Sequence, residues 1–92
     1  MEIAKMLTIS TAHITEETAR LLDVEPNNND MWLTVYNKAN FGWFMYVHKN
    51  LEDRNITDDL RKCLELAKAN DCEWLCLDCD GDVVDELDEY EW

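Results

Sequence analysis

Two short runs rich in aromatic and β-branched residues constrain the fold of this 92-residue chain more than any other feature. Residues 32–36 (WLTVY) and 43–47 (WFMYV) have the composition of β-strands. Between them, residues 37–42 contain asparagines and Gly42, which favour a turn. The pattern predicts a β-hairpin, and a chain of this length has room for a single hydrophobic core around it.

One strand and one helix are expected on each side of the hairpin. Residues 6–9 read as a strand, and Thr15 can cap a helix that ends near residue 23 or 24. This helix has an apolar side made of Ile14, Ala19, Leu21 and Leu22. A second helix, which begins after Thr57 and stops at Asn70, has an apolar stripe made of Leu60, Cys63, Leu64 and Ala67. Residues 25–30 read as a loop, and 73–78 as the last strand.

The resulting order, β-α-β-β-α-β, is that of the split βαβ arrangement of ferredoxin-like folds. The sequence therefore predicts a single α+β domain over residues 1–92, in which an antiparallel sheet carries two helices on one face. Residues 79–92 are expected to form an acidic C-terminal extension of this domain.

Negative charge is concentrated at the C-terminus. The chain has 21 Asp and Glu against 8 Lys and Arg, a net charge of −13, and residues 71–92 contain no base at all. Binding to nucleic acid or to an anionic membrane depends on clustered Lys and Arg. Neither kind of direct contact is therefore expected, and the partner should instead have a basic surface.

The four cysteines, Cys63, Cys72, Cys76 and Cys79, raise the questions of compartment and metal binding. The first fifteen residues lack the pattern of a secretory signal, so a cytoplasmic protein with reduced, buried thiols is expected. The cysteine spacings do not form the paired CxxC framework of a zinc site. No metal and no cofactor are assigned.

An enzymatic alternative rests on residues 78–82, whose sequence DCDGD follows an apolar run. It resembles the nucleophile motif of haloacid-dehalogenase phosphatases, which implies Asp78 as nucleophile, Asp80 as acid, and magnesium. That family needs further elements downstream, and only ten residues follow Asp82. His13 and His48 lie in no recognisable catalytic pattern. We therefore predict a non-enzymatic protein with no catalytic residue.

Four stretches resemble an uncharacterised family of small acidic proteins carried on bacterial conjugative and phage-like mobile elements. They are residues 7–15 (LTISTAHIT), 36–44 (YNKANFGWF), 74–81 (WLCLDCDG) and 90–92 (YEW). The resemblance implies a setting rather than an activity, since mobile elements must survive host restriction and CRISPR systems.

The leading hypothesis is an anti-restriction or anti-CRISPR protein that mimics DNA and blocks a defence nuclease complex. If the last strand persists, Asp78, Asp80 and Asp82 lie on one side, about 6.6 Å apart. Further acids extend this charge, so that the expected partner-binding residues are Asp78, Asp80, Asp82, Asp85, Glu86, Asp88, Glu89 and Glu91.

The competing hypothesis is a protein-interaction or homodimerisation module, such as a toxin-neutralising partner, that binds through aromatic side chains. Its expected surface is the helix-free sheet face with Trp32, Tyr36, Phe44 and Tyr46. A third interpretation has the C-terminal tail covering that face. Apolar residues alternate with acids in the tail, which predicts that it docks on the domain and holds its carboxylates outward.

Overall fold

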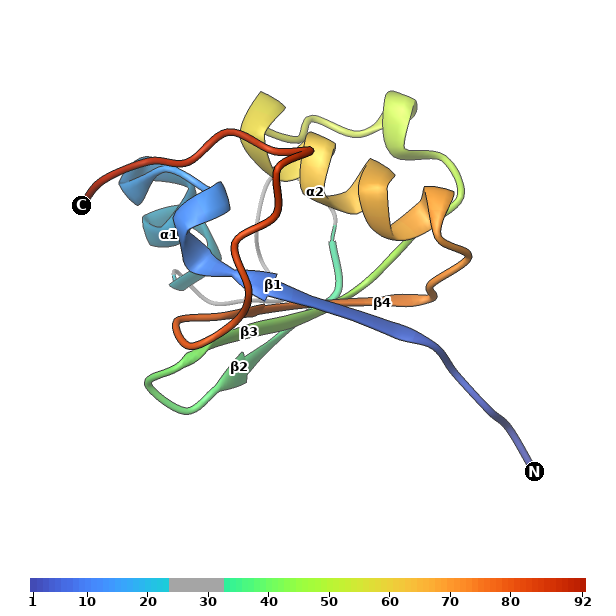
Figure 1. The fold of residues 1–92 in the computed structure, drawn as a ribbon. Coiled ribbons are helices and arrows are strands. Elements are labelled where there is room, and N and C mark those ends of the chain that lie inside the picture. The colour runs from blue at the N-terminus through green and yellow to red at the C-terminus, as the bar shows by residue number, and fades with distance from the viewer. Residues whose placement is uncertain (24–32) are drawn as a thin grey trace.

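The computed structural model describes residues 1–23 and 33–92, in which a four-stranded sheet is covered on one face by helices (Figure 1). The strands are β1 (Met6–Ser10), β2 (Val35–Lys38), β3 (Gly42–Tyr46) and β4 (Trp74–Asp78), and the helices are α1 (Glu16–Asp23) and α2 (Asp58–Ala69). Two 3-10 turns, η1 (Thr11–His13) and η3 (Leu51–Asp53), were not predicted from the sequence. The predicted loop at 25–30 lies outside the described residues.

The sheet is mixed, so the prediction of an antiparallel sheet is wrong. Its order is β1-β4-β3-β2, with β1 parallel to β4 and the other two pairs antiparallel. A split βαβ unit joins two parallel strands through a helix and leaves room for a third strand between them. Here α2 joins β3 to its immediate antiparallel neighbour, β4. The α+β class and the order of elements along the chain are confirmed, but the topology differs from the one expected.

The composition of β4 explains its place inside the sheet. Its three central residues, Leu75, Cys76 and Leu77, are all buried, so the strand is apolar on both faces. Strands buried on both faces show continuous apolar runs of this kind rather than alternation. In β1, by contrast, Met6 is exposed at the start of the strand, and β1 is an edge strand of the sheet.

The hairpin forms as predicted, but its turn is shorter. Residues 37 and 38 belong to β2, and the turn is limited to residues 39–41, with Ala39 in a left-handed conformation at φ 48°. Gly42 follows at φ 153°, and a Cβ there would lie 1.7 Å from the carbonyl oxygen of Leu77. Only glycine therefore allows β3 to lie this close to β4 at that point.

Both helices begin where the sequence predicts. Thr15 accepts a hydrogen bond from the backbone N–H of Thr18, which caps α1, and α2 ends at Asn70. The predicted apolar stripe of α2 is fully buried. In α1 the expectation for Leu21 is wrong, because it is exposed and Thr18 takes the inward position instead.

The core lies between the helices and one face of the sheet. It is formed by apolar side chains from every strand and both helices, among them Ile9, Leu22, Val35, Met45, Leu64 and Leu75. Burial of each such side chain stabilises the fold by roughly 1.5–3 kcal/mol. No helix within residues 1–23 or 33–92 is long and apolar enough to cross a membrane.

Candidate functional site

The C-terminal tail, residues 79–92, is neither helix nor strand, yet its backbone is fixed to the domain. The carbonyl oxygen of Asp82 accepts from the N–H of Ser10 at 2.9 Å, and the N–H of Tyr90 donates to Ala12 at 2.7 Å. The indole N–H of Trp92 donates to the carbonyl oxygen of Ile14 at 2.9 Å. The tail thus runs beside the end of β1 and η1, on the helix side of the sheet (Figure 1).

His13 is the central fixing point of the tail. Its side chain is 1% exposed, and its Nε2 accepts a hydrogen bond from the N–H of Val84 at 3.0 Å. Because Nε2 accepts, Nδ1 carries the proton in the neutral ring and donates to the carbonyl oxygen of Asp88 at 2.8 Å. One imidazole therefore satisfies two backbone groups of the tail, a role that the sequence pattern did not reveal.

The apolar residues of the tail divide between the core and the surface. Val84 and Leu87 pack against the core, whereas Val83 and Trp92 are about half exposed or more. The predicted docking of the tail is confirmed, although fewer of its apolar side chains are buried than expected. The tail does not cover the sheet face that lacks helices, so that interpretation is wrong.

The carboxylates of the tail point outward. The exposed acids are Asp80, Asp82, Asp85, Glu86, Asp88, Glu89 and Glu91. The base nearest to them is Lys62, whose Nζ lies 3.7 Å from a carboxylate oxygen of Asp88. Both side chains are largely exposed, so this ion pair contributes little to stability and leaves the acidic surface accessible.

Asp78 differs from the other predicted acids. The strand ends at this residue, and the chain turns at residues 79–81, so the expected alternation of Asp78, Asp80 and Asp82 along one strand is wrong. One oxygen of Asp78 accepts from the Lys38 ammonium and the other from the N–H of Asp80. The hydrogen bond from Lys38 is the main cause that holds the pKa of Asp78 below its ordinary value. Its carboxylate therefore stabilises the turn.

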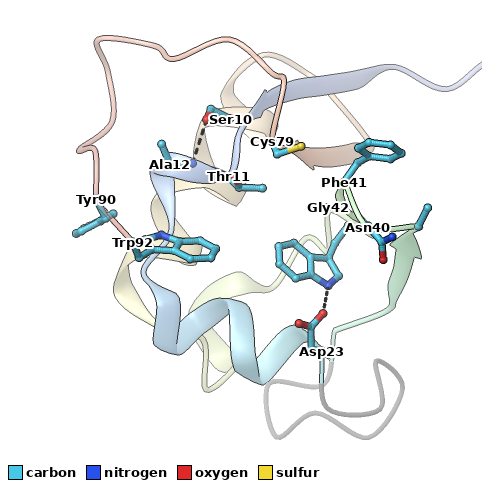
Figure 2. A pocket seen from close by; sticks show the side chains of 12 residues that line it. Ser10, Thr11, Ala12, Asp23, Asn40, Phe41, Gly42, Cys79, Tyr90 and Trp92 are labelled. Carbon is cyan, nitrogen blue, oxygen red and sulfur yellow. Dashed lines mark hydrogen bonds between the residues drawn. The ribbon is translucent and has the colours of Figure 1, made fainter.

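A pocket of about 580 Å³ opens beside the tail. Its walls come from several parts of the chain (Figure 2). They are formed by residues 10–12, Asp23, the hairpin turn with the start of β3 (39–43), Cys79, Tyr90 and Trp92. Every lining residue except Asp23 comes from one of the four stretches quoted above for the family resemblance. The tail lines the pocket at Cys79 and again at Tyr90, and no residue between these two lines it. Residues 79–90 therefore form an arch with both ends at the pocket (Figure 2).

The lining of this pocket includes aromatic rings and one carboxylate. The indole N–H of Trp43 donates to Oδ1 of Asp23 at 3.1 Å (Figure 2). Asp23 Oδ2 makes no hydrogen bond with the part of the chain that the structure describes. Phe41 and Trp92 are 51% and 56% exposed, which leaves their rings available to a ligand.

The cysteines are free thiols, as predicted, but Cys79 is exposed rather than buried. Burial raises the pKa of the Cys63 thiol to about 12, which makes it inert. Within residues 1–23 and 33–92, Asp78, Cys79 and Asp80 are the one group of side chains close enough to share a metal ion. Because both oxygens of Asp78 are already engaged, this acidic turn needs no ion to account for it.

The predicted aromatic face is present on the helix-free side of the sheet. Tyr36 and Phe44 are cross-strand partners, and the ring of Tyr46 lies 5.6 Å from that of Trp74 in an edge-on contact. Trp74 was not among the residues predicted for this face, and Trp32 lies outside the described residues. His48 contacts the Tyr46 ring, and burial together with Arg54 lowers the pKa of this histidine.

Comparison with known protein families identifies the family of this chain. A family model described as the C-terminal domain of a family of unknown function, DUF5983, matches residues 6–92. The chain belongs to the DUF5983 family. The match covers both the helix-and-sheet body and the tail of this DUF5983 domain, so the pocket and the arch lie entirely within it. Comparisons with curated proteins and with solved structures found no match.

Membership of an uncharacterised family is thereby confirmed, whereas the link to mobile elements stays a prediction. The sequence of this DUF5983 domain predicted the acidic tail and the aromatic strands but not the pocket. Its walls come from segments far apart in the chain, and no spacing pattern connects Asp23 with Phe41 or Trp92. The available signal was that nearly all of the lining residues fall within the stretches that carry the family resemblance.

Proposed function

We propose that this domain is a non-enzymatic, cytoplasmic binding protein of a mobile element that blocks a host defence nuclease or CRISPR-type complex by mimicking nucleic acid. One observation supports it best: the arch carries six acids, all exposed, on a backbone fixed to the domain. They are Asp80, Asp82, Asp85, Asp88, Glu86 and Glu89.

The fixed backbone is what distinguishes this tail from an ordinary solvated acidic tail. A disordered tail would lose conformational entropy when it entered a basic groove, and that loss would weaken binding. Here the contacts of His13 with Val84 and Asp88 hold the arch before any partner arrives. Its carboxylates can then occupy the positions of phosphate groups at little further entropic cost, with Asp78 serving only to hold the turn.

The test is an affinity pull-down from bacterial lysate, performed at low and high salt and with a competing DNA duplex. The charge variant carries four neutralising substitutions, D80N, D82N, D85N and E86Q. We expect the unaltered domain to capture nucleic-acid-binding proteins that DNA displaces, and the variant to lose them. Binding through charge falls steeply with ionic strength, so capture should also be lost at high salt.

The matched control neutralises four exposed acids on the rest of the domain: E17Q, E52Q, D53N and E65Q. It has the same net charge as the tail variant but an intact arch. If the control still captures the nucleic-acid-binding proteins, binding depends on the arch rather than on overall charge. Equal capture by both variants would overturn the proposal.

A second function is favoured by the open aromatic face. Tyr36 and Tyr46 are exposed there, and no helix or tail segment among the described residues lies over them. Large apolar surfaces of this kind are typical of protein interfaces, including homodimers. The double variant Y36S and Y46S would abolish binding through this face, and salt would have little effect on it.

A further inference from the structure

The pocket next to the arch has no role in simple charge mimicry. Its volume of about 580 Å³ falls within the range of about 300–1,000 Å³ that is typical of ligand sites. Such sites combine aromatic walls with a few polar groups that fix the orientation of the ligand. Here the aromatic part comes from the exposed rings of Phe41 and Trp92 and from the largely buried Trp43, and the polar groups include Asp23 and Asn40.

The chemistry of this lining selects for a planar cation. The aromatic faces attract a positive charge, and a guanidinium group stacks on them better than a compact ammonium does. Asp23 is held by Trp43 through Oδ1, which leaves Oδ2 to accept from a ligand N–H. The side-chain oxygen of Asn40 can accept from a second donor of the same fork.

We propose that the pocket receives the guanidinium group of an arginine side chain that belongs to the basic partner of the arch. This inference rests on the proposed function, because it names the chemistry by which the same partner is anchored. The arch begins and ends at the pocket wall, so an arginine seated there places its neighbouring residues against the exposed acids. Pocket and arch thus form one surface, in which charge attracts the partner and the arginine fixes its position.

The first experiment uses N-acetyl-L-argininamide as the probe and N-acetyl-L-citrullinamide as its neutral isostere. Binding is followed by NMR through the indole N–H signals of Trp43 and Trp92. We expect saturable shifts with the arginine compound, with a dissociation constant on the order of 1 mM, which corresponds to about −4 kcal/mol. The citrulline compound should bind at least about tenfold more weakly, because its neutral urea group cannot form a charge-assisted hydrogen bond with Asp23. Equal affinity for the two compounds would overturn the proposal.

Substitutions locate the site. D23N should weaken binding of the arginine compound by about tenfold, since it removes the charge that the guanidinium needs. W92L should weaken it through loss of the aromatic face, and its melting temperature shows whether the tail remains docked. E65Q, the matched control, removes one exposed charge on α2, outside both the pocket and the arch, and its affinity should stay within about twofold of the unaltered domain. A D23N variant that binds as well as E65Q would contradict the assignment.

Cys79 offers an independent readout. It lines the pocket and is the exposed member of the four cysteines. The arginine compound should slow alkylation of this thiol by N-ethylmaleimide, whereas the citrulline compound should not. Unchanged alkylation at a saturating concentration would place the ligand elsewhere and overturn the proposal.

A peptide with one arginine flanked by lysines, together with its citrulline version, separates this inference from the proposed function. Both proposals hold if the arginine peptide binds more tightly than the citrulline peptide and if D80N, D82N, D85N and E86Q weaken it. If the two peptides bind equally and both depend on the arch, the pocket proposal fails and charge mimicry stands. If the arginine compound binds but the peptide gains nothing from the arch, the pocket serves a free guanidino compound, and the proposed partner is wrong.

Discussion

At the scale of single residues, Asp59 shows how a buried charge can hold two helices together. The side chain lies in the first turn of α2, and its oxygens accept from the N–H of Thr15 at 2.8 Å and the hydroxyl of Thr18 at 3.0 Å. Burial alone would raise the pKa of Asp59, but these hydrogen bonds outweigh it and hold the pKa below its ordinary value. The start of α1 is thereby fixed to the start of α2.

We expect D59N to lower the free energy of unfolding by roughly 1.5–3 kcal/mol at neutral pH, because it removes hydrogen bonds to a charged acceptor. A carboxyl with a lowered pKa in the folded state stabilises the fold above the pKa of the unfolded chain, 3.8, and loses that contribution as the pH falls through the lower folded value. Urea unfolding between pH 2.5 and 7 measures this. The difference in unfolding free energy between the unaltered domain and D59N should narrow only below about pH 4. A difference that stays constant with pH would contradict the assignment.

Local signals predicted much of what single residues do. Thr15 caps the start of α1 and Asn70 ends α2 as expected, and the apolar stripe of α2 is buried as its spacing predicts. Asp59 and His13 could not be assigned in this way, since their partners lie far along the chain. The hydrogen-bonding role of a polar side chain depends on which distant backbone groups the fold brings to it.

At the scale of elements, the tail depends on one side chain. Replacing His13 by alanine leaves the N–H of Val84 and the carbonyl of Asp88 without their partner and removes a buried ring. We expect H13A to lower the free energy of unfolding by about 2–4 kcal/mol. The amide protons of residues 84–90 should then exchange much faster with solvent. Deletion of residues 83–92 should lower the melting temperature at least as far as H13A does.

The matched variant is H48A, which changes the other histidine, on the far face of the sheet. Its tail amides should keep their protection against exchange. Should H13A leave the tail protected as well, the packing of Val84 and Leu87 alone would suffice to dock the tail, and the role given to the imidazole would be wrong.

Periodicity and turn chemistry identified each helix and strand to within a few residues, but not their arrangement. A chain with the order β-α-β-β-α-β can close its sheet in more than one strand order, and neighbouring segments alone do not distinguish them. The continuous burial of β4 was visible as the run WLCL, which is typical of an inner strand. The path of the tail was equally non-local, because its contacts are with residues 10–14 at the other end of the chain.

At the scale of the whole molecule, the net charge of −13 acts against the compact state through mutual repulsion. Salt screens that repulsion over a length of about 10 Å at 0.1 M. The melting temperature should therefore rise by several degrees between about 10 and 200 mM NaCl, as calorimetry can show. The variant with D80N, D82N, D85N and E86Q should melt higher at low salt and rise less. If the melting temperature fell as salt was added, ion pairs such as that of Lys38 with Asp78 would outweigh the repulsion.

The position of β4 also bears on how this domain is made in the cell. β1 is synthesised before every other strand of the sheet, yet its strand partner is β4, with Met6 opposite Trp74. Until β4 has left the ribosome, β1 has no neighbour in the sheet, and the hairpin of β2 and β3 lacks the strand that links it to β1. Pairing across so long a stretch of chain is slow compared with local folding. A nascent chain arrested before residue 74 should therefore expose its apolar strands to chaperones and proteases, from which the released protein is protected.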